Sequence, residues 1–429
     1  MRGEYKIVIL ASILWIASSQ NIGVISFSLK SIISDLGIVG GLTTSLLASA
    51  QNIGMLIGAL ISGPVADRIG RSGVIKTFTF LHAVSTLLTG LSPSVDILIL
   101  FRFLIGLGVG GALPIIASLV AEYSSIERRG RNISSVETFW AVGWLSAVLL
   151  AYYALSTPEN WRLYMIFAGL ISVFLVVLAS ISIPESIRYL LSRGRREEAE
   201  KLMDKYGVKP PNIRDLKLDM LESLKILWSR EYRLSTLSLW ITWFSITMGY
   251  YGIFIWLPTL ITSGSQEIDI YMSTNRFIYL IIITLAQIPG YLSAVYLVDR
   301  IGRKKVLSIY LILTAVSSYF FALSTTVVQL YISGIILSFF DLGAWAALYT
   351  YTPEQYPTHI RGMGSSWASS IGRVGGILGA FIVPWLGGPG NWFTIFILFA
   401  LIHVIGGISV LAGRELAKME MPEILVSTE

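Results

Sequence analysis

Four side chains that carry charge at neutral pH lie inside long apolar segments of this sequence. They are Arg102, Glu137, Asp341 and Arg373. A charge at the centre of a membrane costs at least about 2.5–3.5 kcal/mol, so such residues are usually paired or line a wet cavity. We therefore expect these four positions, rather than the charged loops, to carry the chemistry of the protein.

Asp341 and Arg373 lie near the middle of consecutive apolar segments, so they can form an ion pair between neighbouring helices. If Arg373 instead faces a cavity, its planar guanidinium suits a carboxylate on a bound solute, which it would hold through two parallel hydrogen bonds. The sequence leaves both roles open for Arg373, a structural ion pair and a contact with the solute.

Asp341, Glu137 and Arg102 are the candidates for proton coupling. Burial favours the neutral form of a carboxyl group whereas an adjacent arginine favours the charged form, so a solute that changes one effect can change the protonation of the acid. Asp341 is the stronger candidate, because Glu137 lies nearer the charged loop and can serve that loop instead. Transport without a proton, or a purely structural role, is the alternative.

Aromatic side chains are dense in the same segments. Tryptophan and tyrosine combine an apolar face with one polar group, which suits an aromatic or amphipathic solute, and packing between helices is the alternative for each. Gln20, Asn21 and Gln287 add uncharged hydrogen-bonding groups of the kind that a sugar would also use. The aromatic candidates for solute binding are Trp140, Trp144, Tyr250, Tyr251, Trp345 and Tyr349.

The composition excludes several other chemistries. The chain has 429 residues, no cysteine and three histidines in separate segments, so it offers no thiolate, disulfide or multi-histidine metal site. No nucleophile and base are paired as in an enzyme, and we expect no metal and no cofactor. The chain is 54% hydrophobic and only 14% charged, against about 25% charged residues in a soluble domain, which predicts a membrane protein.

About twelve apolar runs of the length needed to cross a membrane recur along the chain. They form two sets of six, in residues 1–183 and 233–412, separated by the polar segment 184–232 and followed by a polar tail, 413–429. The polar segment is expected to form short amphipathic helices. Lysine and arginine concentrate in the loops of one side, which places both termini and the central segment in the cytoplasm.

A repeated charged motif indicates that the two sets are related. The stretch Asp67–Arg71 recurs letter for letter as Asp299–Arg303, and both copies follow one long apolar segment and precede another. Two unrelated matches at one spacing are improbable by chance, so the sequence predicts two homologous halves. The second match at the same spacing relates Glu122 and Arg129 to Glu354 and Arg361.

These motifs resemble those of the major facilitator superfamily. Gly63–Arg71 resembles its signature between helices 2 and 3, Arg102–Gly111 the arginine and glycine pattern of helix 4, and Pro184–Tyr189 the sugar-porter element after helix 6. The resemblance covers residues 5–412 and implies an all-α membrane protein of twelve transmembrane helices in two pseudo-symmetric six-helix bundles. It implies a cytoplasmic latch between the halves, formed by Gly63, Asp67, Arg68, Gly70, Arg71, Glu122, Arg129, Asp299, Arg300, Gly302, Arg303, Glu354 and Arg361.

Within this superfamily the chain resembles the organic-ion, synaptic-vesicle-protein-like and niacin-type branch more than the sugar porters. Gly249–Pro258 and Pro353–Gly362 carry that resemblance, and the Gln-Gln pair of sugar porters early in helix 7 is missing. Related aromatic-acid symporters carry acids in helix 1, where this chain has Gln20 and Asn21. Helix 1 therefore offers no acid for a proton.

The resemblance implies a secondary active transporter that moves a small organic ion, a carboxylate or aromatic acid, with a proton by alternating access. Two other functions stay open: a sugar or polyol porter, and a transporter-like sensor that binds its solute without moving it. We expect a monomer in the plasma membrane. Its expected partners are a small-molecule substrate, membrane lipids and protons, and no nucleic acid.

Overall fold

The computed structural model describes residues 2–125, 128–155, 160–208, 220–261, 265–356 and 358–415. Over these ranges the chain is helical, without a β-strand. The predicted twelve long helices are present, in two sets of six separated by three short ones.

The first set comprises α1 (Arg2–Asp35), α2 (Gly41–Ile69), α3 (Arg71–Thr89), α4 (Val95–Tyr123), α5 (Arg129–Ala154) and α6 (Trp161–Ser180). The short helices are α7 (Ile187–Ser192), α8 (Arg196–Tyr206) and α9 (Met220–Leu227). The second set comprises α10 (Arg233–Leu260), α11 (Gln266–Ile301), α12 (Arg303–Ala322), α13 (Val327–Glu354), α14 (Thr358–Ile382) and α15 (Trp392–Ser409).

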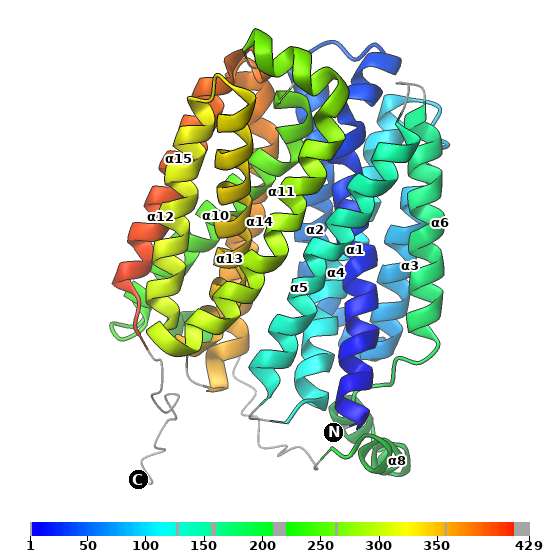
Figure 1. Cartoon of the computed structure of the whole chain (residues 1–429). Helices are drawn as coiled ribbons and strands as arrows, with labels where there is room; N and C mark the ends of the chain where they lie inside the picture. Colours follow the sequence, from blue (N-terminus) through cyan, green and yellow to red (C-terminus); the bar gives the residue numbers. More distant parts are fainter. Residues whose placement is uncertain are drawn as a thin grey trace. The chain divides into compact units, whose positions relative to one another are not determined.

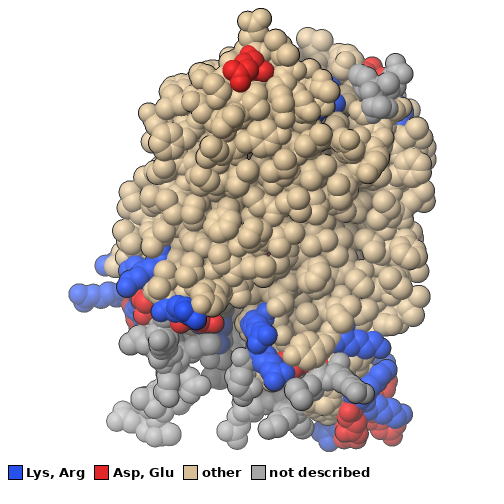
Figure 2. Space-filling view, viewed as in Figure 1, with Lys and Arg blue, Asp and Glu red and all other residues tan. Residues whose placement is uncertain are grey.

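The long helices have the length and surface of membrane spans. Ten of the described helices are long and apolar enough to cross a membrane, and α3 and α10 complete the two sets. Figure 2 shows a wide band with almost no charged side chains on the visible face, and Lys and Arg gathered along its lower border. About 20 helical residues cross a hydrocarbon core, so a helix such as α11, with 36 residues, extends beyond it.

Contacts divide the chain into two compact units, which are described separately. Unit 1 comprises Met1–Ile213, Phe254–Leu285 and Ala380–Gly390. Unit 2 comprises Arg214–Ile253, Ala286–Gly379 and Asn391–Glu429. The first six helices thus belong to unit 1, and α12, α13 and α15 belong to unit 2.

In unit 1, α2 and α4 lie side by side and pack backbone against backbone (Figure 1). A Cβ atom at Gly54 of α2 would overlap the carbonyl of Phe103, and one at Gly106 of α4 would overlap the carbonyl of Gln51. Small residues permit such close approach between membrane helices, where leaving lipid gives larger apolar side chains little advantage. The glycines of α4 therefore serve helix packing.

In unit 2, α10 and α14 also pack closely at glycine residues. A Cβ atom at Gly375 or Gly379 of α14 would overlap the backbone of α10 at Phe244 and Met248. In the same unit α12 packs against both α13 and α15. These contacts fix the helices that carry the candidate functional residues described below.

The described part of the central polar segment forms α7, α8 and α9. In Figure 1, α8 lies beside the N-terminal end of α1, and Gly3 there leaves no room for a side chain against the backbone of Tyr206. The hydroxyl of Ser186 begins α7 by accepting a hydrogen bond from the backbone N–H of Tyr189, as N-cap residues do. Residues 209–219, within the same segment, lie outside the described ranges.

Candidate functional site

Arg373 on α14 forms a hydrogen bond with the side chain of Tyr251 on α10. The arginine is only 8% exposed. The two helices approach closely because Gly376, one turn after Arg373, packs against the ring of Tyr251. One bond to a tyrosine hydroxyl orients a guanidinium, whose five N–H donors form a fixed fork. The pair therefore presents a positioned cation inside unit 2.

Asp341 on α13 faces His403 of α15, and this corrects the suggested pairing with Arg373. Nε2 of His403 lies 3.0 Å from Oδ1 of Asp341, and both side chains are fully buried. Sequence analysis gave His403 no partner and missed this contact. The signal that could have found it was an isolated imidazole inside the last apolar segment, since a buried polar group needs a partner.

Four aromatic rings from α10 and α13 form a contiguous cluster, the aromatic box: Trp243, Tyr250, Trp345 and Tyr349. The centroid of Trp345 lies 5.8 Å from Trp243 and 5.7 Å from Tyr250, both edge to face, and 5.9 Å from the stacked ring of Tyr349. These distances are typical of favourable aromatic pairs. Tyr250 also contacts the ring of Tyr251 at 5.1 Å, so the box continues to the residue that holds the arginine.

The structure thus brings together five residues that the sequence marked for solute binding. Trp243 completes the set, and its indole nitrogen donates to the hydroxyl of Thr352 at 2.9 Å. The five are Tyr250, Tyr251, Trp345, Tyr349 and Arg373.

Buried polar atoms without a hydrogen-bond partner among the described residues follow one face of α13. Three of those on α13 share this face, Ser338 Oγ, Asp341 Oδ2 and Trp345 Nε1, at spacings of three and four residues. Gln287 of α11 is fully buried, and neither of its amide atoms has a partner in the described chain. An unsatisfied buried group costs about 1–3 kcal/mol, so this face is suited to a polar solute.

Gln20 and Asn21 bind other helices of unit 1. The amide of Gln20 donates to the carbonyl of Ala168 at 3.1 Å and accepts from the hydroxyl of Ser146 at 3.2 Å. The amide of Asn21 donates to the ring of His82 at 2.7 Å. These bonds tie α1 to α3, α5 and α6, and a role of the two amides in solute binding stays a prediction.

The two tryptophans predicted for solute binding in unit 1, Trp140 and Trp144, are buried on α5. Trp144 makes edge-to-face contacts with Phe27 of α1 at 6.1 Å and with Phe254 of α10 at 6.4 Å. These contacts are packing contacts within one unit. Solute binding by the two tryptophans stays a prediction.

Arg102 and Glu137 are also buried in unit 1, on α4 and α5. None of the three guanidinium nitrogens of Arg102 has a hydrogen-bond partner among the residues that the structure describes. Proton coupling by Arg102 or Glu137 stays a prediction.

The first copy of the repeated motif is held by Glu185, which follows α6. Its Oε1 accepts from the backbone N–H groups of Arg71 at 2.7 Å and Ser72 at 3.2 Å, at the first turn of α3. The helix dipole favours a negative charge there. Gly70 precedes this turn with φ +87°, and the matching Gly302 has φ +100°, which explains why both copies carry glycine.

Further predicted latch residues of unit 1 contact the segment after α6. Glu122 accepts from the hydroxyl of Ser186 at 2.7 Å, and Arg193 donates to the carbonyl of Asp67 at 2.7 Å. A Cβ atom at Gly63 would meet no atom within 4 Å, so close packing does not require glycine there. The hydroxyl of Tyr189 donates to the carbonyl of Arg68, and Nε of Arg129 donates to the carbonyl of Ala121, each at 3.0 Å.

The second copy repeats this arrangement in unit 2. Glu415 accepts from the backbone N–H of Lys304 at 3.1 Å, at the first turn of α12. Arg303 bridges Asp299 at 3.0 Å and Glu354 at 3.1 Å. Each of these contacts lies within one unit, and the latch between the halves stays a prediction. Arg300 lies over the ring of Tyr296, and Arg361 donates to the carbonyl of Tyr356.

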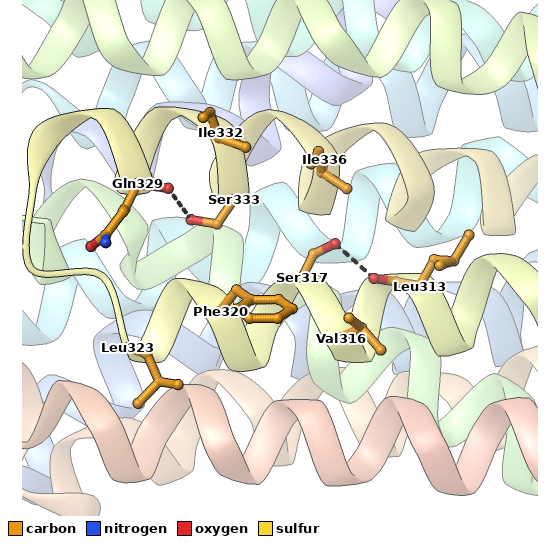
Figure 3. A pocket seen from close by; sticks show the side chains of 9 residues that line it. All are labelled: Leu313, Val316, Ser317, Phe320, Leu323, Gln329, Ile332, Ser333 and Ile336. Atoms are coloured by element: carbon orange, nitrogen blue, oxygen red, sulfur yellow. Dashed lines mark hydrogen bonds between the residues drawn. The ribbon is translucent and has the colours of Figure 1, made fainter.

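A groove of about 370 Å³ lies between α12 and α13 (Figure 3). The hydroxyls of Ser317 and Ser333 donate to the carbonyls of Leu313 and Gln329 of their own helices, each at 2.7 Å. Phe320 is 58% exposed. The groove therefore offers apolar contacts on the outer surface of unit 2, which suit an acyl chain better than a polar solute.

Comparisons with known proteins identify a family and several relatives for this chain. The family described as "Sugar (and other) transporter" matches residues 7–414. The niacin transporter NiaP of Acinetobacter baylyi is 36% identical, over 96% of this chain and 94% of its own. The 4-hydroxybenzoate transporter PcaK of Pseudomonas aeruginosa is 29% identical, over 93% of this chain and 89% of its own.

A solved structure shows the same fold. The xylose transporter XylE from E. coli, in a partially occluded inward open conformation, superposes with a TM-score of 0.76, covering 95% of this chain and 97% of its own. The identity is 17%, so the likeness concerns the fold alone. It confirms the predicted arrangement of twelve helices.

Proposed function

The chain belongs to the sugar (and other) transporter family of the major facilitator superfamily, and on this premise we propose that it moves a monocyclic aromatic carboxylate across the membrane with a proton. Relatives named as transporters of niacin and of 4-hydroxybenzoate support the solute class. Each of these solutes is one aromatic ring bearing one carboxylate.

The observation that carries the proposal is the position of Arg373 and Tyr251 beside the aromatic box. A guanidinium binds a carboxylate through two parallel N–H···O bonds, and hydrogen bonds to charged groups contribute about 1.5–3 kcal/mol each. Edge-to-face and stacked rings, such as those around Trp345, suit a planar aromatic solute. The solute would then place its ring against the box and its carboxylate at Arg373.

Alternating access by rocking of two bundles is the mechanism that the fold favours. We assign the coupling acid to Asp341, since it is fully buried on the face of α13 that also carries Trp345 of the box. The bias of lysine and arginine toward one set of loops supports a plasma-membrane protein with both termini in the cytoplasm. We propose a monomer.

Uptake of radiolabelled nicotinate into proteoliposomes under an inward proton gradient tests the proposal. Arg373→Ala removes both bonds and should weaken the apparent affinity by more than about 100-fold, the equivalent of at least about 3 kcal/mol. The apparent affinity of Arg373→Lys should lie between those of the wild type and Arg373→Ala, because lysine keeps the positive charge but lacks the planar guanidinium that forms two parallel hydrogen bonds. Arg195→Ala is the matched control, because Arg195 lies exposed on the surface and pairs only with Glu198 in the described contacts. Uptake by Arg373→Ala equal to that of the control would remove Arg373 from the site.

A sugar or polyol is the second candidate, favoured by the unsatisfied uncharged groups of Gln287 and Ser338. Such a solute would need donors and acceptors rather than a cation. Competition decides between the two: excess benzoate should block nicotinate uptake, and excess xylose or glucose should leave it unchanged. Block by the sugars and not by benzoate would favour the second candidate.

A further inference from the structure

The hydrogen bonds of His403 determine where one of its protons lies. Nδ1 is 2.7 Å from the backbone carbonyl of Phe399, one turn earlier on α15. A carbonyl oxygen can only accept, so Nδ1 must carry a proton. In a neutral imidazole the other nitrogen, Nε2, is then a bare acceptor.

That bare acceptor faces a carboxyl group. Nε2 lies 3.0 Å from Oδ1 of Asp341, and a deprotonated carboxylate is also an acceptor only. Two lone pairs cannot form a hydrogen bond, so the observed contact needs a proton between them. Either Asp341 is a neutral acid that donates to His403, or His403 is an imidazolium that donates to a carboxylate. Both forms hold one shared proton and leave the pair neutral overall, as suits two side chains that are fully buried.

His82, which is buried in unit 1, shows the contrasting case. Nδ1 of His82 is 2.7 Å from the amide nitrogen of Asn21, which can only donate. His82 therefore accepts at Nδ1 and is neutral with its proton on Nε2, 3.3 Å from the hydroxyl of Ser18. A histidine with only amide and hydroxyl partners needs no shared proton, so His82 is the matched control for His403.

Within the membrane part of unit 2, the described helices around the pair carry no carboxyl or imidazole group besides Asp341 and His403. The other titratable side chains there are tyrosines and one arginine: Tyr250 and Tyr251 on α10, Tyr291 and Tyr296 on α11, Tyr310 and Tyr319 on α12, Tyr331, Tyr349 and Tyr351 on α13, and Arg373 on α14.

We propose that Asp341 and His403 together form a one-proton store that joins α13 to α15 and that the transported proton occupies. The inference deepens the proposed function and rests on its proton coupling. Loss of the proton leaves a carboxylate against a bare nitrogen, which breaks the contact. The imidazole packs against Gly249 of α10, where a Cβ atom would overlap the ring, so a displaced ring presses on α10. Since α10 and α13 also form the aromatic box, proton loss changes the solute site.

Histidine NMR on the full-length protein tests the store without any solute. With only three histidines in the chain, ¹⁵N-histidine labelling gives few signals, and His403→Gln and His82→Gln assign two of them. We expect Nδ1 of His403 to stay protonated throughout, and Nε2 to lose its shared proton in one step as pH rises. In Asp341→Asn the amide donates to Nε2, so that step should vanish. A step that persists in Asp341→Asn, or an unprotonated Nδ1, would overturn the inference.

Uptake measurements provide a second test of the proton store. Stimulation of nicotinate uptake by an inward proton gradient should fall to about 1-fold in His403→Gln and persist in His82→Gln, and full stimulation in His403→Gln contradicts the inference. Asp341→Asn removes the shared proton by replacing the carboxyl group of the pair. It takes the place of His403→Gln in this assay if His403→Gln does not fold. If the wild type shows the NMR step but takes up no nicotinate, the solute assignment fails and the store stands. If the step is absent, the store fails whatever the uptake.

Discussion

Replacing Tyr251 by phenylalanine removes one hydroxyl group from the proposed solute site. The ring remains, and with it the contact to Tyr250 at 5.1 Å and the packing against Gly376. What disappears is the hydrogen bond to Arg373. Bonds to charged groups contribute about 1.5–3 kcal/mol. Arg373 keeps its charge, so we expect the lower value to reach the solute, which is about a tenfold loss of affinity for a carboxylate.

Equilibrium binding of nicotinate and of nicotinamide to the purified protein measures this loss. Nicotinamide has the same ring and no charge, so its affinity should change little in Tyr251→Phe. The matched control is Tyr164→Phe in unit 1, where the hydroxyl of a fully buried tyrosine donates to the carbonyl of Ala147 at 3.0 Å. Tyr164→Phe should lower the unfolding free energy by about 0.5–1.5 kcal/mol without affecting either ligand.

Two results would refute the reasoning. If Tyr251→Phe weakened nicotinate and nicotinamide equally, the hydroxyl would act on the ring site and not through the guanidinium. If it weakened nicotinate no more than Tyr164→Phe does, Tyr251 would be a packing residue only.

Two further predictions concern stability. Glu185→Ala leaves two N–H groups at the start of α3 without their carboxylate acceptor, and the thermal unfolding transition should shift by the equivalent of about 0.5–2 kcal/mol, as for other lost caps. Glu198→Ala, an exposed glutamate on α8, is its control, and equal shifts would contradict the capping role. Gly106→Leu forces a side chain into the backbone of Gln51, which should cost more than the ~1–3 kcal/mol of ordinary overpacking. Size-exclusion chromatography should show loss of monodisperse protein, whereas Gly130→Leu, where a Cβ atom meets nothing within 4 Å, should elute as the wild type.

The number and order of the long helices could be predicted from sequence because apolar length is a direct requirement of the membrane. Their ends could not, since charged residues continue a helix beyond the hydrocarbon core. The helix α11, for example, begins at Gln266 and carries Glu267 and Asp269 in its first turn, before its apolar run. The repeated motif marked Arg71 and Arg303, but their caps, Glu185 and Glu415, come from segments far along the chain.

The sequence marked several residues that lie together in unit 2, but it did not predict which of them are paired. Arg373 and Trp345 were recognisable because charge and aromatic density inside a span are unusual. The partner of Asp341 was not, because helices adjacent in sequence are not always those whose faces meet: α13 meets α15 through His403 rather than α14 through Arg373. An imidazole in an apolar span is as strong a signal as a carboxylate, since each needs a partner.

The backbone contact between α2 and α4 has a mechanical consequence. At Gly54 and Gly106 the carbonyl groups of one helix lie directly against the α-carbons of the other. No side chains separate the two backbones there. Neither helix can therefore slide along or rotate against the other without a backbone clash. Any conformational change in this part of the protein must move α2 and α4 together as one rigid body.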